Sequence, residues 1–283
     1  ALVSPSEGWA VGEAGTVLHL SGGRWSAVAS PTSADLYGVA LASADEGWAV
    51  GLDVARGHGV MLHLSHGRWS LVPSVATPAL RAIALVAPGE GWAVGDGGTM
   101  LHLTGGRWLP FSGPTSADLY GLAMLSPAEG WATGFSINNA PTGAVYDSTI
   151  LTFAGGHWGV AGTAHDTRLF AVAATPQLAW LVGESAPGGG TILFGSGGLF
   201  TLSGGDVHQA LQAVALATPN AGWAVGFDGV LYRDSFNRWE MRASPTTTDL
   251  YALALISPAD GWAVGNDGVI LRLRNGSWNL YTG

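Results

Sequence analysis

The sequence predicts an all-β fold, a seven-bladed β-propeller in which each blade is a four-stranded antiparallel meander. The first observation is a pentapeptide that occurs seven times. The second is the spacing of its tryptophans, roughly 40 residues, which is typical of propeller blades. The third is that no stretch shows a helical period. The copies read Gly-Trp-Ala-Val-Gly at 8–12, 47–51, 91–95, 222–226 and 261–265, Gly-Trp-Ala-Thr-Gly at 130–134 and Ala-Trp-Leu-Val-Gly at 179–183.

The second repeat shows the parts of one blade most clearly. Short apolar runs alternate there with turns rich in Gly, Pro, Ser and Asp, which is the pattern of strands joined by tight turns. We therefore expect four strands in this blade, at Leu36–Ala42, Gly47–Gly51, Gly59–Leu64 and Arg68–Val72.

Alternation within the pentapeptide predicts how blades pack. Trp48 and Val50 fall on one face of the strand, and Gly47, Ala49 and Gly51 fall on the other, because successive side chains point to opposite faces. Each sheet then has a bulky side and a small side. We expect the bulky side of one blade to pack against the small side of the next.

The repeat covers the whole chain as one domain. A tryptophan marks the fourth strand of six blades, and Phe200 takes its place in the fifth. Residues 1–4 match 40–43, so the first strand of the first blade is cut short. Either a segment that is not shown completes it, which we favour, or this blade has a short inner strand. The predicted blades are at about 1–29, 30–73, 74–112, 113–162, 163–205, 206–243 and 244–283.

The composition of the chain limits the classes of partner that we expect it to bind. The chain has 283 residues, 47% of them apolar, and a formal net charge of −9, so a basic face for nucleic acid or for an anionic membrane is not expected. Cysteine is absent, which excludes disulfides, thiolate metal sites and cysteine nucleophiles. No apolar run is long enough to insert into a membrane. Few charges, many small residues and no cysteine favour a secreted or surface-displayed bacterial protein.

Three sequence segments carry a family resemblance. They are Leu-Tyr-Gly-Val-Ala-Leu at 36–41, the pentapeptide, and Val-Leu-His-Leu-Ser-Gly-Gly-Arg-Trp at 17–25. Together they resemble the BNR/Asp-box-like propellers, and above all the branch that holds Ycf48/HCF136-type photosystem assembly factors and many secreted bacterial proteins. The turn at 21–24 lacks the aspartate of a full Asp box, so the form is degenerate.

The resemblance implies the fold far more strongly than a function, because propellers of this kind include assembly factors, lectins and glycosidases. A photosystem-assembly role implies a positively charged patch. Here the 11 basic residues are all arginines dispersed over the repeats, which argues against that role.

Insertions identify the variable face of the predicted ring. The connection between the second and third strands is longer in blades 2, 4 and 5, at 52–59, 135–148 and 184–190. In a meander these connections share one face with the entrances to the first strands, and such a variable face often carries function. The candidate binding residues on it, each of which could also be a solvated loop residue, are Asp53, Arg56, His58, Arg81, Asn138, Asn139, Tyr146, Asp147, His165, Asp166 and Arg168.

A second set repeats at the entrances of blades 2, 4 and 7. One interpretation is an acidic, aromatic rim of the channel mouth, suited to a sugar or a cation. The other is that each aspartate caps backbone N–H groups and each tyrosine packs between blades; threefold repetition favours this second interpretation. The rim residues are Asp35, Tyr37, Asp118, Tyr120, Asp249 and Tyr251.

Catalytic and metal chemistry find little support. His19, His63 and His102 recur at one position of successive blades, whose sheets are about 10 Å apart, too far for shared metal ligation. His165 and Asp166 are a weak indication of acid–base chemistry, because the sequence identifies no nucleophile to act with them. We therefore predict no catalytic residues, no metal and no cofactor.

The prediction for function is a non-catalytic binding or scaffold propeller that binds a protein or a glycan through the variable face. One alternative is a carbohydrate-active enzyme with two carboxylates at the channel mouth, which would need to lie about 5 to 9.5 Å apart. The other is a self-assembling subunit of a surface layer or filament.

Overall fold

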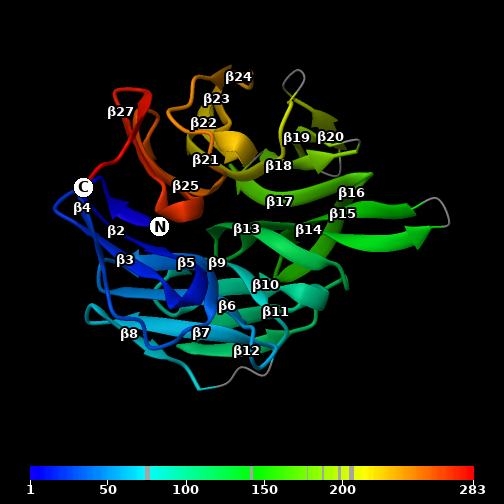
Figure 1. The fold of residues 1–283 in the computed structure, drawn as a ribbon. Helices are drawn as coiled ribbons and strands as arrows, with labels where there is room; N and C mark the ends of the chain where they lie inside the picture. The colour runs from blue at the N-terminus through cyan, green and yellow to red at the C-terminus, as the bar shows by residue number, and fades with distance from the viewer. Residues whose placement is uncertain (74–76, 141–142, 177, 187, 197–198, 204–206) are drawn as a thin grey trace. The chain divides into compact units, whose positions relative to one another are not determined.

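The computed structural model confirms the fold class. It describes the chain except residues 74–76, 141–142, 177, 187, 197–198 and 204–206, and the side chains of residues 139, 140, 143 and 144 also lie outside the description. The described residues form seven antiparallel sheets of four strands each, a seven-bladed β-propeller (Figure 1). The chain divides into two compact units: unit 1 is 1–130 with 153–159, and unit 2 is 131–152 with 160–283. The single domain and its blade boundaries stay a prediction.

Unit 1 holds the first three sheets and the start of the fourth. Within each sheet the strands follow the order of the chain, as a meander requires. The strands are β1 (Leu2–Ser4), β2 (Glu7–Val11), β3 (Val17–Ser21) and β4 (Arg24–Ala27); β5 (Asp35–Ser43), β6 (Glu46–Asp53), β7 (His58–Ser65) and β8 (Arg68–Leu71); β9 (Leu80–Ala87), β10 (Glu90–Gly95), β11 (Met100–Thr104) and β12 (Arg107–Phe111); and β13 (Asp118–Ser126).

The fourth sheet continues with strands that have residues in both units, and unit 2 holds the last three sheets. The strands are β14 (Glu129–Ala140), β15 (Gly143–Ala154) and β16 (His157–His165); β17 (Thr167–Ala174), β18 (Ala179–Ser185), β19 (Gly189–Ser196) and β20 (Leu199–Leu202); β21 (Leu211–Thr218), β22 (Ala221–Gly226), β23 (Leu231–Ser235) and β24 (Trp239–Arg242); and β25 (Leu250–Ser257), β26 (Asp260–Gly265), β27 (Ile270–Arg274) and β28 (Ser277–Leu280).

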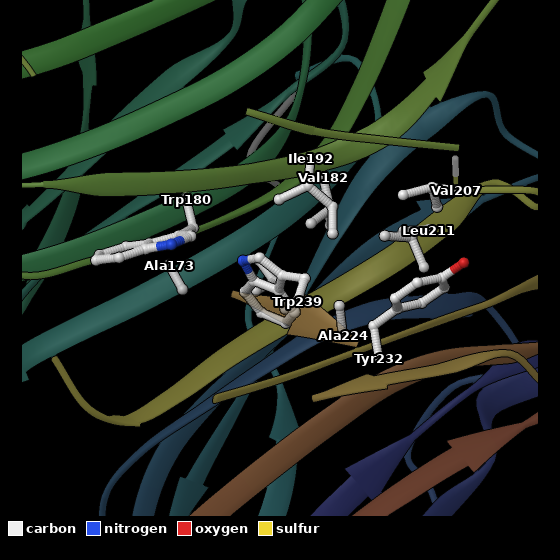
Figure 2. Packing of buried hydrophobic residues seen from close by; sticks show 10 residues of the cluster. Ala173, Trp180, Val182, Ile192, Val207, Leu211, Ala224, Tyr232 and Trp239 are labelled. Carbon is white, nitrogen blue, oxygen red and sulfur yellow. The ribbon is translucent and has the colours of Figure 1, made fainter. Parts of the chain in front are cut away.

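The predicted packing of bulky against small sides is confirmed inside each unit. In unit 1, Trp48 and Val50 of β6 pack against Ala93 of β10 and Leu101 of β11 in the next sheet. In unit 2, Trp180, Val182 and Ile192 pack in the same way against the next sheet, at Ala224, Tyr232 and Trp239 (Figure 2). The tryptophan of the pentapeptide is therefore a core residue.

The last glycine of the pentapeptide has a different role from the one its alternation predicts. We expected it to make one face small for the neighbouring blade. Instead, a Cβ on Gly51 would lie 1.9 Å from the carbonyl oxygen of Asp35, which belongs to the first strand of the same sheet. The register of β5 and β6 shifts beside this point. The bulge brings the two backbones so close that only glycine fits.

The histidines that recur in the third strands have a structural role. His63 Nε2 lies 2.7 Å from Glu46 Oε1, and the imidazole stacks on Trp48 with ring centroids 4.2 Å apart. His102 repeats the arrangement with Glu90 and Trp92. These histidines are thus paired within their own sheets.

The fifth blade keeps its fourth strand without the tryptophan. Phe200 of β20 pairs with Gly195, the register that Trp25 has with Leu20 in the first sheet. The phenyl ring meets Trp131 edge-on at 6.1 Å, as predicted for a degenerate but complete blade.

The three insertions differ from the expected loops. In blade 2 the strands continue through the insertion until Asp53 pairs with His58. In blade 5 they continue until Ser185 pairs with Gly189. The insertions extend the hairpin because the antiparallel ladder can go on pairing backbone groups. Elsewhere in the described residues the same connection is a short 3-10 turn: η1 (Glu13–Gly15), η2 (Asp96–Gly98), η3 (Phe227–Gly229) or η4 (Asn266–Gly268).

Candidate functional site

The three repeated aspartates are caps for these 3-10 turns. Asp35 Oδ1 accepts a hydrogen bond of 2.9 Å from the backbone N–H of Ala14, the middle residue of η1, which has a φ of 50°. Asp118 caps Gly97 of η2 in the same way, and Asp249 caps the backbone N–H of Asp228 in η3. Each carboxylate thus stabilises a left-handed residue in the sheet before its own.

The pattern of caps follows the pattern of turns. Where the preceding sheet has an extended hairpin and no 3-10 turn, the position before the buried leucine of the first strand is not aspartate. It is Ala79 after blade 2, Arg168 after blade 4 and Ala210 after blade 5. The interpretation of these aspartates as backbone caps is therefore confirmed, and folding alone accounts for their threefold repetition.

In unit 1, an arginine side chain is held between two tyrosine rings. The first strands β5, β9 and β13 contact one another in that order. They bring the guanidinium carbon of Arg81 to 4.9 Å from the ring centroid of Tyr37 and 5.4 Å from that of Tyr120. Arg81 Nε and Nη2 also donate to the two carboxylate oxygens of Asp96, over 2.7 and 2.8 Å. Three sheets together fix this one side chain.

The electrostatics follow from these contacts. The hydrogen bonds to Asp96 raise the pKa of Arg81 above its usual value. Partial burial raises the pKa of Tyr37, although the nearby guanidinium opposes that shift. Tyr37 still exposes 40% of its surface. The tyrosines around Arg81 therefore form an aromatic surface of fixed conformation, and Asp96 neutralises the positive charge of Arg81.

A related cluster forms in unit 2. The guanidinium carbon of Arg168 lies 4.6 Å from the ring centroid of Tyr146 and 6.0 Å from that of Phe170. Arg168 also forms an ion pair with Glu184. Phe135 meets both aromatic rings edge-on, at 6.1 and 5.9 Å. The base of the blade 4 hairpin is thereby anchored to the first strand of the next sheet.

Asp147 contacts two other predicted candidates in the same unit. His165 Nδ1 lies 2.6 Å from Asp147 Oδ1, and Asn138 Nδ2 donates to Oδ2 over 2.7 Å. The hydrogen bond from His165 lowers the pKa of Asp147, desolvation opposes this shift, and the hydrogen bond from Asn138 contributes less than either. Asn139 was predicted beside them, but its side chain lies outside the described residues.

The remaining candidates are engaged locally. Arg56 donates from Nη1 to Asp53 Oδ2 over 2.6 Å within one turn, and His58 Nδ1 lies 3.0 Å from the carbonyl oxygen of Gly59. Asp166 is exposed, has a φ of 52°, and its carbonyl oxygen accepts from Ala186 N–H.

Sequence reasoning missed Asp96 and Glu184, which hold the two arginines. A signal for both was present, because each directly follows the last glycine of a pentapeptide, at Gly95 and Gly183. Phe135 stands at the same position after Gly134. The residue after the pentapeptide therefore lies beside the start of the first strand, where it can touch the candidate side chains.

Within the described part of the chain, no group of three or more His, Cys, Asp or Glu residues could hold a metal ion. No helix among those residues is long and apolar enough to cross a membrane.

Neither a protein-family model nor a curated protein matches the sequence, but solved structures do. A structure described as YCF48 bound to D1 peptide has a TM-score of 0.69 at 20% identity, covering 96% of this chain and 89% of that one. YCF48 from Cyanidioschyzon merolae has 0.68 at 19%, covering 96% and 93%. The WD40 propeller domain of Doa1 has 0.66 at 12%, covering 99% and 90%. The chain is thus a Ycf48-like propeller in its fold.

Proposed function

We propose that this protein is a non-catalytic scaffold that binds an extended segment of a partner protein across the starts of its first strands. The observation that carries the proposal is the cluster of Tyr37, Arg81 and Tyr120, with Asp96 locking the arginine. Three neighbouring sheets contribute to it, so an extended segment lying across them would meet all three.

The residue types suit a protein interface. Tyrosine and arginine are enriched among the few residues that supply most binding energy in protein complexes. Here their rotamers are held before any partner arrives, so binding loses less side-chain entropy. Arg81 is neutralised by Asp96, which removes the cost of burying an unpaired charge.

Two further facts support a binding role. In the structure of YCF48 bound to D1 peptide, a protein of the same fold holds a peptide, which makes a peptide a reasonable ligand class to test. The aspartates that a glycosidase would need at the channel mouth have a structural task, because Asp35, Asp118 and Asp249 cap turns. Propeller folds otherwise support many functions, so the residues of the site decide the function.

We also retain the extended hairpins at 52–59, 135–148 and 184–190 as part of the proposed binding face. Each continues its sheet beyond the level at which the short 3-10 turns end it. Shortening all three to the length of η2 is expected to keep the fold and reduce partner binding. Unchanged affinity would restrict the face to the first-strand starts.

A location outside the cytoplasm is a further proposal. It is supported only by composition: few charged residues, 44 glycines and no cysteine. Fractionation of the source cells would test it. Glycan binding and self-assembly remain outcomes that the experiment below can reveal.

The experiment is a selection from a displayed library of unstructured peptides against the whole chain. Tyr37→Ala should weaken the selected peptides about 30-fold, the effect of a hot spot worth about 2 kcal/mol. The control is Leu71→Ala, which removes an apolar side chain of β8 that is 49% exposed, against 40% for Tyr37, and should leave affinity unchanged. If no peptide binds, a glycan array and a solution mass measurement decide between the two alternatives.

A further inference from the structure

The outer strand of the fifth sheet, β20, has an unpaired edge. Among the described residues it stands last in the order β17-β18-β19-β20, so no strand of the sheet pairs with its outer side. The hydrogen bond of 2.8 Å from Ser203 N–H to the carbonyl oxygen of Ile192 fixes the bonding pattern along the strand. Because the pairs of an antiparallel ladder alternate, Thr201 bonds to β19, and the backbone N–H and C=O groups of Phe200 and Leu202 point away from β19.

The side chains of β20 are apolar and open to solvent. Leu199 and Leu202 expose 80% and 75% of their surfaces. No residue from 185 to 205 carries a formal charge. Edge strands of soluble proteins commonly carry charges or a proline, which keep another strand from adding to the sheet. The four residues of β20 include neither, so the edge can accept a further strand.

The other outer strands have features that β20 lacks. The sheets can be aligned on the tryptophan of the fourth strand, which Phe200 replaces. The position of Leu199 is then polar in the other sheets, where it holds Arg24, Arg68, Arg107, His157, Arg238 and Ser277. The position of Leu202 is Pro110 in β12, and that of Thr201 is Glu240 in β24. β28 is also uncharged, but Asn279, a poor strand residue, stands there in place of Thr201.

The sequence of β20 is complementary to itself. When two copies pair antiparallel, the residues whose backbone groups point outward must face one another. This register sets Phe200 opposite Leu202 of the partner subunit on both sides of a twofold axis, and each such pair exchanges two backbone hydrogen bonds. The two Thr201 side chains then lie opposite each other on the axis, and a Thr–Thr pair stabilises adjoining strands. The ring of Phe200 would also cover apolar surface of the partner subunit's Leu202.

We propose that β20 is a self-association edge, through which two copies of this chain join antiparallel about a twofold axis. Charge complementarity favours a second copy as the occupant, because uncharged side chains meet across the axis although each whole chain carries a net charge of −9. A twofold contact is closed, so the product is a dimer and not a fibre. The inference goes beyond the proposed binding function and does not depend on it.

The size of the contact sets its strength. A strand of four residues buries less surface than the roughly 1,200 Å² at which stable complexes begin. We therefore expect a weak dimer with a dissociation constant on the order of 100 µM. Sedimentation equilibrium of the whole chain between about 10 µM and about 1 mM brackets that value. The average mass should rise toward twice that of the monomer, with little effect of salt, because no charges meet across the axis.

A charge-exchange experiment tests the register. Thr201→Glu sets two carboxylates opposite each other and should keep the protein monomeric over the whole range. The strand should tolerate the change, because Glu240 occupies this position in β24. Thr201→Lys alone should be monomeric for the same reason. An equimolar mixture of the two variants should dimerise, because opposite charges then meet on the axis, and added salt should weaken that dimer.

A second variant tests the backbone contact. Leu202→Pro removes an N–H that points away from β19 and should abolish the dimer, while Pro110 shows that the outer strand of a sheet accommodates proline at this position. The matched control is Asn279→Glu, which places the charge of Thr201→Glu at the equivalent position of β28 and should leave the dimer unchanged. Circular dichroism establishes that each variant is folded. If Leu202→Pro is not, the mixture of the two Thr201 variants decides alone.

Three results would overturn the inference: a parent chain that stays monomeric at the highest concentration, a dimer that survives Thr201→Glu, or equal loss of the dimer in Asn279→Glu. A monomeric parent whose selected peptides no longer bind after Leu202→Pro would show that the edge takes an extended segment of another protein instead of a second copy. The binding function is tested separately, because Tyr37→Ala leaves β20 unchanged and should not alter the dimer.

Discussion

Gly95→Ala should be one of the most damaging small substitutions in this protein. A Cβ at Gly95 would lie 1.9 Å from the carbonyl oxygen of Ala79. The obstacle is backbone, so no rotamer change relieves it, and the two strands must move apart. That movement breaks the hydrogen bond from Asp96 N–H to Ala79 and strains the one from Gly95 N–H to Thr99, both 2.9 Å long.

The magnitude follows from these losses. Two backbone hydrogen bonds contribute about 1 kcal/mol each, and forcing atoms into a packed site typically costs about 1–3 kcal/mol more. We expect the free energy of unfolding to fall by about 3–5 kcal/mol and the melting temperature by roughly 10 °C. The same shift would move Asp96 away from Arg81, so partner binding should weaken as well.

A matched control lies two residues away. Gly97 has a φ of 63°, and a Cβ there would meet nothing within 4 Å. Its equivalent in η1 is Ala14, at a φ of 50°. Gly97→Ala should therefore cost only about 1 kcal/mol. Urea unfolding followed by tryptophan fluorescence measures both variants. Equal destabilisation by the two substitutions would refute the close-approach explanation of the pentapeptide glycine.

Three further predictions concern charged groups. Arg81→Met and Tyr37→Leu, alone and combined, should give a coupling free energy of about 0.5–1 kcal/mol in urea unfolding; additive effects would mean that the stacked contact contributes nothing. Burial raises the pKa of Asp234, so its contribution to stability weakens as the pH rises from about 4; the melting temperature of Asp234→Asn, minus that of the parent, should rise between pH 4 and 7. The pKa of Asp147 is lowered, chiefly by its hydrogen bond with His165, so its contribution is present above about pH 4 and lost as the pH falls through the lowered pKa; the destabilisation by Asp147→Asn should shrink in acid, and a constant difference would contradict this.

The fold could be predicted from the sequence because the same blade pattern occurs in it seven times. Trp48 lies in the second blade and Trp180 in the fifth, yet each packs into the neighbouring sheet as alternation requires. Phe200 shows that the pattern survives the loss of its marker, since the register of β20 is kept. Such local rules depend on side-chain period and on turn residues, both of which are visible in the letters.

The arginine contacts could not be predicted from the same rules. Arg81 is 15 residues from Asp96, and the two meet only because a bulge shifts the register at the end of β9 and β10. Alternation alone assumes an unbroken ladder and would misplace the residue after Gly95. The link between Asp147 and His165 likewise joins a hairpin to the end of β16, and no spacing rule foresees it.

The role of the three capping aspartates could be predicted only in part. Asp35, Asp118 and Asp249 were identified by repetition, which suggested either a rim site or backbone capping. The decision required knowing that a left-handed turn residue in the preceding sheet faces each carboxylate. The sequence already held the clue, because the aspartate is missing at Ala79 and Ala210, where the preceding sheet has no 3-10 turn.

In unit 2, Gln212 and Phe227 stand at the positions that Arg81 and Asp96 occupy in unit 1, so both residues of the ion pair are replaced together. Losing Arg81 alone would leave a half-buried carboxylate without its partner, and losing Asp96 alone would leave the guanidinium unbalanced; either is costly. Replacing both at once removes the charge without that penalty and leaves Tyr251 with an aromatic neighbour. Stability therefore accounts for why the two positions differ together.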